Sequence, residues 1–422
     1  MNLEEWLAFI ERQHVRPVDL GLDRPGIVKA ALGQKQTCPV ILVGGTNGKG
    51  STCALLERIL LCAGYRVGLY TSPHLLSYNE RVRVDGRPAD DAALCEAFAR
   101  VESARVSVGG TPLTYFEFGT LAAWEVFAVH PLDAIILEVG LGGRLDATNL
   151  YEPDISIVTG VDLDHMDYLG ATREDIGFEK AGIFRSLRPA VCGDADPPTS
   201  LLEHAWAIGA DLQVIGDDFG FIPQEGQWQY WGRGGRKSGL AFPALRGGGQ
   251  LANAACVLTA LDLLWQRLPV AMGDIRLGLA EVELSGRFQV VPGRPTVVLD
   301  VAHNPQAARV LADSLGDMIG YPTTWAVFGM LRDKDIAGVV RAVRHRIDRW
   351  LPCQLPGPRA ASAEEVAAIL AAEGVDGPLQ TFPSPAAAIA YARENAGDGD
   401  RILAFGSFLT VADVMRVPAR VE

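Results

Sequence analysis

The chain has 422 residues, of which 48% are hydrophobic and 21% charged, and it carries a formal net charge of −13. This is the composition of an ordinary globular protein with room for two or three domains. The acidic balance, with no local block of Lys and Arg, excludes a nucleic-acid-binding surface, and no apolar run is long enough to span a bilayer.

The N-terminus and the cysteines indicate a cytoplasmic protein. The first residues contain neither the basic nor the apolar segment of a secretory signal. The seven cysteines are odd in number, scattered, and include no Cys-x-x-Cys pair. They are typical of reduced core residues and argue against a zinc site or a disulfide framework. We therefore expect a protein that acts in the cytoplasm and binds neither nucleic acid nor membrane.

The chain begins with two predicted helices and then a glycine-rich loop. Apolar residues at helical spacing predict a helix over residues 3–10, and a loop over 19–26 precedes a short helix over 27–32. The next stretch, VILVGGTNGKGST over residues 40–52, reads as a strand, a glycine loop and a helix start. Backbone N–H groups converge at such a helix start, and a lysine there contacts the outer phosphates of a nucleotide.

The spacing of this loop differs from the standard P-loop. Val43 stands where that pattern has its first glycine, and Gly50 separates Lys49 from Ser51. A glycine-rich turn with a surface lysine is the plain alternative. Three glycines between a strand and a helix favour the phosphate site.

Polar residues follow the next predicted strands. A strand over residues 65–70 leads to Ser72, which Pro73 keeps out of a helix; on its own this segment reads more readily as an ordinary Ser-Pro turn. After a predicted helix over 90–101, and a segment over 113–120 that leads into a helix through residue 127, a strand over 133–138 ends in Glu138. A carboxylate that closes an apolar strand in a P-loop protein commonly holds Mg²⁺.

Two further candidates follow the strand predicted over residues 155–160. His165 lies among three aspartates and reads equally well as a metal ligand or as a solvated turn residue. A helix predicted over 172–184 carries Lys180 among apolar residues, where a salt bridge or snorkelling is the default interpretation. Catalysis is the less common role for such a lysine.

The rest of the chain predicts a second α/β domain. Strands at 189–192 and 213–215, a hairpin excursion over 219–245 and a helix over 250–265 complete the first half. A hinge near 283–288 divides the chain into domains 1–284 and 285–422. Strands over 296–300, 325–330 and 401–407 then alternate with helices, which predicts a parallel sheet in each half.

These strand-end residues share one edge of the first sheet. Lys49 and Ser51, Ser72, Glu138 and His165 follow successive strands, and ligands sit at the carboxyl ends of parallel strands. Together they offer a phosphate cradle and ligands for a hard divalent ion. A neutral histidine is an unusual Mg²⁺ ligand and suggests a second metal position or tolerance of Mn²⁺.

At this point the chain resembles a known family. The segments GGTNGKGS, YTSPHL, LEVGLGGRLDATN, TGVDLDHMDYLG, EKAGIF, LDVAHNP and GSFLTVADV are similar to those of the folylpolyglutamate synthase/dihydrofolate synthase family of the Mur ligase superfamily. The resemblance runs from about residue 3 to residue 415. It implies an α/β protein with a P-loop parallel-sheet N-terminal ATPase domain and a smaller Rossmann-like C-terminal domain that binds glutamate.

The resemblance also implies an activity and its ligands. The enzyme would be an ATP-dependent ligase that joins L-glutamate to dihydropteroate and to folylpolyglutamates. Its cofactors would be ATP and Mg²⁺ at two sites, with Mn²⁺ able to substitute, and it would act as a monomer. A carboxylate is a poor acyl donor, so ATP would first convert it to an acyl phosphate, and the two domains would close to bring ATP and glutamate together.

Residue roles carry over from the family motifs. Those for ATP fall on Gly48, Lys49, Gly50, Ser51, Asn253, Arg287 and Asp300. Those for metal fall on Ser72, Glu138, His165 and Lys180, the last as a carbamylated lysine. Lys49, Lys180, Arg287 and His303 would be catalytic, and glutamate would meet His303 and Ser407. Dihydropteroate or folate would contact Asp19, Leu20, Gly21, Leu22, Thr114, Tyr115, Phe116, Glu117, Leu145, Asp146 and Ala147.

The chain departs from the family pattern in two places. Gly249-Gln250 replaces a common His-Gln before Asn253, which puts that adenine contact in doubt, and Val301 replaces a common glycine. Three other readings stay open: a monofunctional folylpolyglutamate synthase, another Mur-type amino-acid ligase such as a muramyl-peptide ligase, and a P-loop regulatory NTPase. About forty residues precede the glycine loop, too few for the extra domain of a muramyl-peptide ligase.

Overall fold

The computed structural model describes residues 1–16, 18–377 and 379–418, which form two compact units. The first comprises Met1–Ala244 and Leu251–Val282, and the second comprises Leu245–Gln250 and the chain from Glu283 onward. Each unit is an α/β structure built on its own largely parallel sheet, as the alternation of strands and helices predicts.

The first unit is organised around an eight-stranded sheet in the order β4-β3-β2-β5-β1-β6-β7-β8. Its strands are β1 (Val40–Gly44), β2 (Val67–Tyr70), β3 (Val82–Val84), β4 (Arg87–Pro88), β5 (Ala134–Glu138), β6 (Ile155–Val158), β7 (Pro189–Cys192) and β8 (Asp211–Val214). All are parallel except β3 and β4, which form an antiparallel edge. The neighbours β2, β5, β1 and β6 are the four strands that precede the predicted phosphate and metal residues.

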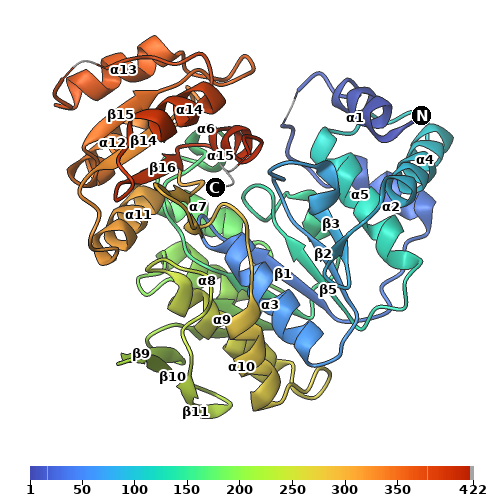
Figure 1. Ribbon diagram of the computed structural model, residues 1–422. Coiled ribbons are helices and arrows are strands. Elements are labelled where there is room, and N and C mark those ends of the chain that lie inside the picture. The colour runs from blue at the N-terminus through green and yellow to red at the C-terminus, as the bar shows by residue number, and fades with distance from the viewer. Residues whose placement is uncertain (17, 378, 419–422) are drawn as a thin grey trace. The chain divides into compact units, whose positions relative to one another are not determined.

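Helices cover both faces of this sheet (Figure 1). They are α1 (Leu3–Glu11), α2 (Asp23–Leu32), α3 (Lys49–Cys62), α4 (Asp91–Ser107), α5 (Tyr115–Ala128), α6 (Met166–Leu169), α7 (Arg173–Ala181), α8 (Thr199–Ile208), α9 (Gln250–Leu263) and α10 (Met272–Glu281), with 3₁₀ turns η1 (Tyr78–Arg81) and η2 (Ala147–Leu150). Side chains alternate between the faces of a strand. Val40 and Leu42 therefore pack with Phe98 of α4 and Phe118 of α5, while α3, with α10 against it, packs on β1, β2 and β5.

The hairpin excursion predicted over residues 219–245 is a separate antiparallel sheet of β9 (Gly220–Gln224), β10 (Gln227–Gly232) and β11 (Gly235–Leu240). Trp228 and Tyr230 of β10 are fully buried. The Tyr230 hydroxyl lies 3.0 Å from the Thr259 hydroxyl of α9, which ties the small sheet to the first unit.

The second unit contains a five-stranded sheet in the order β12-β13-β16-β14-β15. Its strands are β12 (Gln289–Val291), β13 (Thr296–Leu299), β14 (Thr324–Phe328), β15 (Arg349–Pro352) and β16 (Arg401–Phe405). Its helices are α11 (Pro305–Asp317), α12 (Ile336–Val343), α13 (Ala363–Ala372), α14 (Pro385–Asn395) and α15 (Phe408–Met415), with the 3₁₀ turn η3 (Arg344–Arg346). β12 is antiparallel and the other strands are parallel.

Several boundaries differ from the sequence prediction. The loop expected over residues 19–26 is wrong in part, since α2 begins at Asp23. Pro25 lies in the first turn of this helix, where its missing N–H costs no helical hydrogen bond. The helix expected over 90–101 extends to Ser107. Short strands β3, β4, β12 and β15 were not predicted, because pairing with a neighbour stabilises segments of two to four residues that carry little pattern of their own. Helices α8 and α10 were not predicted either.

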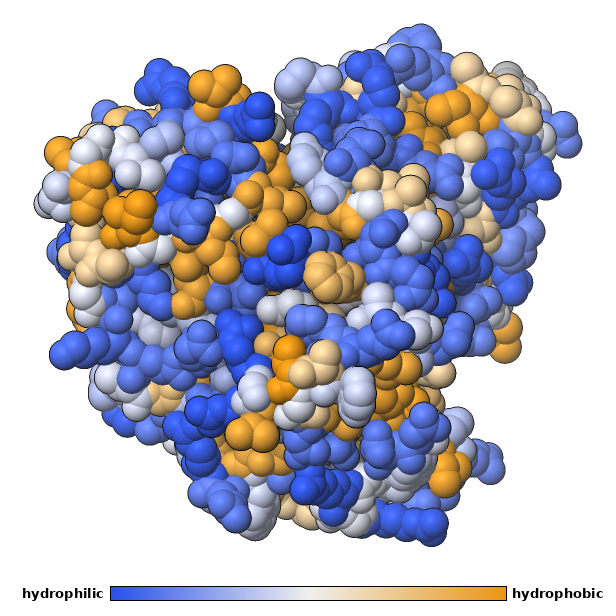
Figure 2. Space-filling model, turned by 180° about the vertical axis from the view of Figure 1, so that it is seen from behind, coloured by the Kyte–Doolittle hydropathy of each residue, from blue (hydrophilic) through white to orange (hydrophobic). Residues whose placement is uncertain are grey.

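The surface mixes residue types. On the face seen in Figure 2, hydrophilic residues predominate and hydrophobic ones lie among them. In the part of the chain that the structure describes, no helix is both long enough and apolar enough to cross a membrane. The seven cysteines are free thiols, five of them buried.

Candidate active site

The glycine loop joins β1 to α3 at the centre of the sheet, and α3 begins at Lys49 itself. Gly48 caps the helix in the left-handed region with φ of 87°. Gly45 has φ of 141°, and a Cβ there would lie 2.0 Å from the Thr159 hydroxyl. Both positions therefore require glycine, and the backbone of the loop stays open at the positive end of the helix dipole.

Hydrogen bonds from the end of β6 hold this loop in place. The Thr159 hydroxyl donates to the Asn47 carbonyl at 2.6 Å. The Thr46 hydroxyl donates to the Asp162 carbonyl at 3.0 Å and accepts the Asp162 N–H at the same distance. The cradle is thus preorganised by the protein, which lowers the conformational cost of binding an anion.

Lys49 lies within the loop. Its Nζ donates to the carbonyls of Gly45 at 2.9 Å and Thr46 at 3.2 Å. Ser51 is in the first turn of α3 and is 4% exposed. The loop therefore combines backbone N–H groups, an ammonium group and a hydroxyl, which are the components of a phosphate site.

Ser72 and Glu138 lie in direct contact at the same edge. β2 and β5 are parallel with Tyr70 paired to Leu137, so both residues follow the ends of adjacent strands. The Ser72 N–H donates to Oε2 of Glu138 at 3.1 Å, and Glu138 is 4% exposed. In the β1–β5 register Glu138 is also opposite Val43, one residue before the end of β1. A hydroxyl and a buried carboxylate therefore adjoin the start of the glycine loop.

His165 follows β6, the strand on the other side of β1. It caps the short helix α6 with φ of 53°, and its side chain is 36% exposed. Its Nε2 lies 3.9 Å from a carboxylate oxygen of Asp164, whose other oxygen accepts the His165 N–H at 2.9 Å. Asp164 therefore holds the backbone of His165 and lies beside its partly exposed imidazole.

Lys180 is buried, 3% exposed, near the end of α7. Burial, and then the positive charge of Lys49, lowers the pKa of Lys180 to about 7, while Asp164 and Asp146 act in the opposite direction. These electrostatic partners mean that Lys180 lies close to both the glycine loop and the His165 segment. A neutral amine near pH 7 is nucleophilic, as an ammonium group is not.

The donors at this edge suit a hard divalent ion. Among the residues that the structure describes, there is no group of three or more His, Cys, Asp or Glu side chains arranged to hold a metal. Mg²⁺ is commonly held by one or two carboxylates together with phosphate oxygens and water. Glu138 with the Ser72 hydroxyl fits that pattern, and His165 provides a nitrogen donor nearby. The residues present therefore fit the predicted ion.

An arginine links two of the three segments predicted to contact the pterin. Arg24 of α2 donates from Nη2 to the Asp19 carbonyl at 2.6 Å, and its Nη1 pairs with the Asp19 carboxylate at 2.6 Å. The same Nη2 lies 2.9 Å from Glu117, which is 4% exposed. Glu117 also forms a capping box with Thr114 at the start of α5. Arg24 therefore holds segment 19–22 against segment 114–117.

The third segment, residues 145–147, is fixed by a buried carboxylate. Asp146 accepts hydrogen bonds from the N–H groups of Leu141 at 2.8 Å and Thr148 at 2.9 Å. Burial nevertheless raises the pKa of Asp146. The Phe116 ring packs on Gly140, where a Cβ would lie 2.6 Å from the ring. This packing brings segment 114–117 to the loop that carries the third segment.

In the second unit, four of the predicted or neighbouring residues form one cluster. The Arg287 guanidinium lies 5.3 Å from the Phe408 ring, and the His303 ring lies 6.2 Å from the same ring. Asp300 accepts the N–H groups of Phe288 at 2.8 Å and Ala302 at 2.7 Å. Burial raises the pKa of Asp300, and the charge of Arg287 acts against that rise.

Ser407 adjoins this cluster in the chain. It caps α15, its hydroxyl accepts the Leu409 N–H at 3.2 Å, and it is 5% exposed. His303 is fixed by a 2.8 Å contact between Nδ1 and the Val301 carbonyl. The two residues predicted to meet glutamate therefore lie just before α11 and at the start of α15, where Phe408 follows Ser407 and lies 6.2 Å from the His303 ring.

Asn253 lies at the glycine loop. A Cβ on Gly48 would meet the Asn253 amide oxygen at 2.5 Å, so this side chain packs directly on the loop. At Gly249, where a histidine is common in the family, an added Cβ would meet no atom within 4 Å. A side chain at this position could therefore begin without a clash at its Cβ, and Asn253 packs on the loop although the histidine is absent.

Four residues of these clusters were not predicted from the sequence. They are Arg24, Thr159, Asp164 and Phe408. Thr159 and Asp164 follow a strand and are polar, so the same strand-end rule that selected His165 was sufficient to find them. Arg24 and Phe408 carry no such signal, because their partners are distant in sequence or ordinary in type.

A parallel sheet with a glycine loop between β1 and α3, and a hydroxyl–carboxylate pair beside it, defines a nucleotide-dependent enzyme. Family models agree: the Mur ligase middle domain matches residues 43–205, and the Mur ligase glutamate ligase domain matches residues 286–408. The class is therefore that of the Mur ligases.

Comparison with individual proteins identifies the family within the Mur ligases. The chain is 44% identical over 416 residues to the dihydrofolate synthase/folylpolyglutamate synthase of Escherichia coli (strain K12), covering 98% of this chain and 95% of that protein. The structure of E. coli FolC in complex with DHPP and ADP is similar with a TM-score of 0.93, at 44% identity, over 99% of this chain and 97% of that one. A bifunctional folylpolyglutamate synthase/dihydrofolate synthase with Mn, AMPPNP and L-glutamate bound gives a TM-score of 0.90, at 44% identity, over 98% and 97%. The chain belongs to the dihydrofolate synthase/folylpolyglutamate synthase family.

Proposed function

We propose that this protein is an ATP-dependent ligase that joins L-glutamate to dihydropteroate, giving dihydrofolate, and also to folylpolyglutamates. The observation that carries the proposal is the edge of the first sheet. There the glycine loop with Lys49, the contacting pair Ser72 and Glu138, and the buried Lys180 lie together. Relatives whose names and ligands are those of a folate–glutamate ligase support the same activity.

The chemistry requires activation of a carboxylate. The γ-phosphoryl group of ATP is transferred to a carboxylate oxygen of the pterin substrate, and ADP leaves. The glutamate nitrogen then attacks the carbonyl carbon, the bond to the phosphate oxygen breaks, and the amine loses one proton. Negative charge gathers on the phosphoryl oxygens during transfer, so we assign its stabilisation to Lys49 and Arg287.

One Mg²⁺ would be held by Ser72 and Glu138, and a second by His165 and a carbamate on Lys180, with Mn²⁺ able to substitute at these sites. When bound, the ion supplies positive charge to the phosphate oxygens. The protein's own contribution is to position the donors: the Ser72 N–H donates to Glu138, and the Asp164 carboxylate accepts the backbone N–H of His165. Second contacts of this kind set the geometry of a metal site.

The domain roles follow from the same proposal. We assign ATP and folate to the domain over residues 1–284 and glutamate to the domain over 285–422, through His303 and Ser407. Asn253 and Asp300 would contact the nucleotide. The working unit in this proposal is a monomer.

Arg24 provides a first test of the folate segments. Arg24→Gln removes the contacts that hold Asp19 and Glu117, so KM for dihydropteroate is expected to rise about tenfold, with KM for glutamate unchanged. Initial-rate kinetics with each substrate varied in turn measures the change. Arg66→Gln is the matched control, because Arg66 makes a similar paired contact to Asp133 at the opposite ends of the strands. An equal effect of both variants would mean that the loss is general.

Arg287 tests the second unit. Arg287→Ala is expected to lower kcat about 100-fold and to raise KM for ATP only a few-fold, since its charge acts on the transferring group. Arg349→Ala is the control, because Arg349 lies over Trp325 at 5.2 Å in a comparable cation–π contact. The reverse pattern, a large rise in KM with kcat preserved, would restrict Arg287 to nucleotide binding.

The activity itself is tested by the acceptors. ADP release is expected to require both glutamate and a pterin carboxylic acid, and to proceed with dihydropteroate and with tetrahydrofolate. Release with tetrahydrofolate alone as acceptor would indicate a monofunctional folylpolyglutamate synthase. ADP release that ignores both substrates would indicate a regulatory NTPase and would contradict the proposal.

A further inference from the structure

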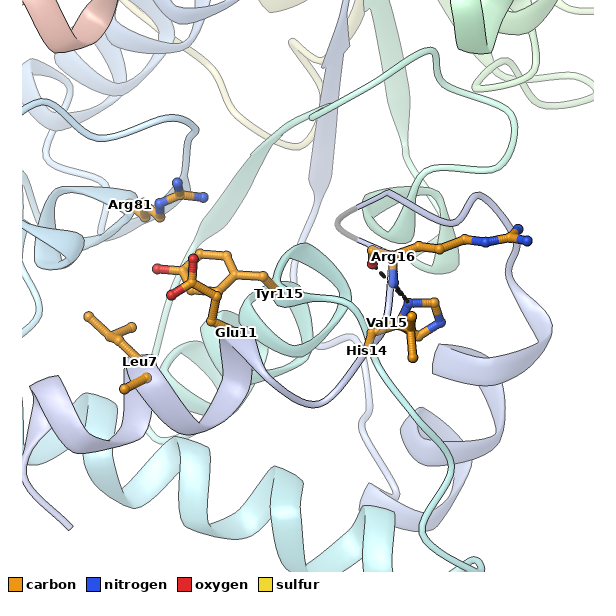
Figure 3. Close-up of a pocket in the computed structure, with 8 residues that line it drawn as sticks. Leu7, Glu11, His14, Val15, Arg16, Arg81 and Tyr115 are labelled. Carbon is orange, nitrogen blue, oxygen red and sulfur yellow. Dashed lines mark hydrogen bonds between the residues drawn. The ribbon is translucent and has the colours of Figure 1, made fainter. Parts of the chain in front are cut away.

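A pocket of about 510 Å³ lies in the first unit beside the folate segments, and of its lining residues only Tyr115 has a role in the site described above. Figure 3 shows it between α1, the loop that follows α1, and the start of α5. The residues that matter for its chemistry are Leu7, Glu11, Val15, Arg16, Arg81 and Tyr115. Its volume is within the range of small-molecule sites.

The cations of this pocket are available to a ligand. Arg81 uses Nε to bond Nδ1 of His74 at 2.8 Å, and its guanidinium lies 5.5 Å from the ring of Tyr115. Within residues 1–16, 18–377 and 379–418, the terminal nitrogens of Arg81 donate to no protein acceptor. Arg16 is 75% exposed and approaches the Asp19 carboxylate no closer than 3.9 Å. The lining has two guanidinium groups and one carboxylate, Glu11; the Asp19 carboxylate beside it is paired with Arg24 at 2.6 Å and with His14 of the lining at 3.3 Å, so the lining carries an excess of positive charge in a chain of net charge −13.

The pocket adjoins both ends of the reaction path. Tyr115 belongs to segment 114–117, so the pocket begins where the pterin segments end. Arg81 bonds His74, which is two residues beyond Ser72 at the sheet edge. A molecule that runs from the pterin segments to the glycine loop therefore passes alongside the pocket.

A growing tail creates a problem of length. Every cycle adds one γ-glutamyl residue and one carboxylate, while the reacting carboxylate must return to the same place beside the glycine loop. If the pterin stays at its segments, the added residues need space away from the direct path. A γ-glutamyl chain alternates methylene groups with carboxylates, which matches a lining of Leu7 and Val15 beside Arg16 and Arg81.

We propose that this pocket is a subsite for the anionic γ-glutamyl tail of folylpolyglutamate substrates. The inference rests on the proposed function and adds to it a binding site for the γ-glutamyl tail, the part of the substrate that changes in length. Arg16 and Arg81 bind tail carboxylates, the apolar residues contact the methylene groups, and Glu11 repels the tail weakly. Dihydropteroate, which has no tail, contacts only Tyr115 among the lining residues and does not reach Arg16 or Arg81.

The test compares acceptors that differ only in tail length. kcat/KM is measured for dihydropteroate, tetrahydrofolate and tetrahydrofolate triglutamate with the unmodified protein and with Arg16→Gln, Arg81→Gln and Glu11→Gln. Arg16→Gln is expected to raise KM for the triglutamate about threefold to fivefold and KM for dihydropteroate by less than about twofold. Arg81→Gln also breaks a hydrogen bond to His74, so its effect is judged by a ratio: kcat/KM for the triglutamate divided by kcat/KM for dihydropteroate. This ratio is expected to fall. Glu11→Gln is expected to lower KM for the triglutamate.

Arg12→Gln is the matched control, because it removes an exposed arginine at the end of the same helix without touching the pocket. Equal changes for all three acceptors would overturn the inference, and a larger loss with dihydropteroate would assign the pocket to the pterin instead. Equilibrium binding of the triglutamate without ATP gives a second readout. Failure of the proposed function can be told apart from failure of this inference. If the proposed function is wrong, the unmodified protein releases no ADP with dihydropteroate and glutamate.

Discussion

Lys180→Arg is expected to reduce turnover by at least about 100-fold while the nucleotide still binds. Arginine keeps the positive charge but has no amine that can take up CO₂. In the native chain, burial and Lys49 lower the pKa of Lys180 to about 7, so much of the amine is neutral at physiological pH. The neutral amine forms a bond to the carbon of CO₂ and releases one proton, which leaves an anionic carbamate able to hold a cation.

Matched variants separate the carbamate from the burial of the side chain. Lys180→Met keeps the apolar stem without a nitrogen, so its fold, measured by circular dichroism and thermal melting, is expected to match the native protein although turnover is lost. Lys180→Ala leaves space in which a small carboxylate such as acetate can stand in for the carbamate, so added acetate is expected to restore part of its activity. Acetate is expected to have no effect on Lys180→Arg. Full activity of Lys180→Arg, with or without bicarbonate, would remove the carbamate from the mechanism.

The rate at which Lys180 takes up CO₂ is expected to depend on pH. The pKa of Lys180 is lowered, so the reactive neutral form is dominant above about pH 7 and declines below it. In protein first depleted of CO₂ and then returned to a fixed concentration of dissolved CO₂, recovery of activity is expected to slow about tenfold per pH unit below pH 7 and to level off above it. Recovery that is independent of pH would mean that this amine does not limit it.

The central edge of the first sheet was predictable because its signals are local. A strand that ends in a polar residue places that residue at the carboxyl edge, whatever its neighbours are. Lys49, Ser72, Glu138 and His165 follow β1, β2, β5 and β6, and those four strands are neighbours in the sheet. Sequence alone did not favour Ser72, since a Ser-Pro turn is common; its contact with Glu138 depends on the pairing of β2 with β5, which no local pattern encodes.

The features that sequence did not reveal depend on distant partners. Arg24 meets Glu117 across 93 positions of chain, and it lies in a helix whose start was hidden by Pro25 and Gly26. The pocket beside the folate segments is of the same kind, since its lining comes from α1, the loop after α1, η1 and α5, and each contributes only one or a few side chains. Strand β15 was missed because four residues of mixed type gain their order from β14. Tertiary pairing decides such positions, and a single sequence does not contain it in readable form.

Lys49→Ala is expected to lower kcat by about 1,000-fold, with a much smaller loss of nucleotide affinity. In this variant the N–H groups at the start of α3 still bind the phosphates. The positive charge of Lys49, which stabilises the negative charge that develops on the transferring phosphoryl group, is gone. Trapping of the acyl phosphate with hydroxylamine, together with ADP release in a single turnover, measures the step directly. Lys35→Ala, which removes an exposed lysine from the loop before β1, is expected to behave as the native protein.

The Lys49 side chain also bonds two carbonyls of its own loop, so its loss removes support as well as charge. Thr159→Val separates the two effects: it removes the 2.6 Å bond to Asn47 and leaves the ammonium group in place. Because the bonds between Thr46 and Asp162 remain, Thr159→Val is expected to raise KM for ATP a few-fold and to preserve most of kcat. If it instead lost as much kcat as Lys49→Ala, loop support would account for both results, and the phosphoryl-transfer role would have to be assigned to another cation.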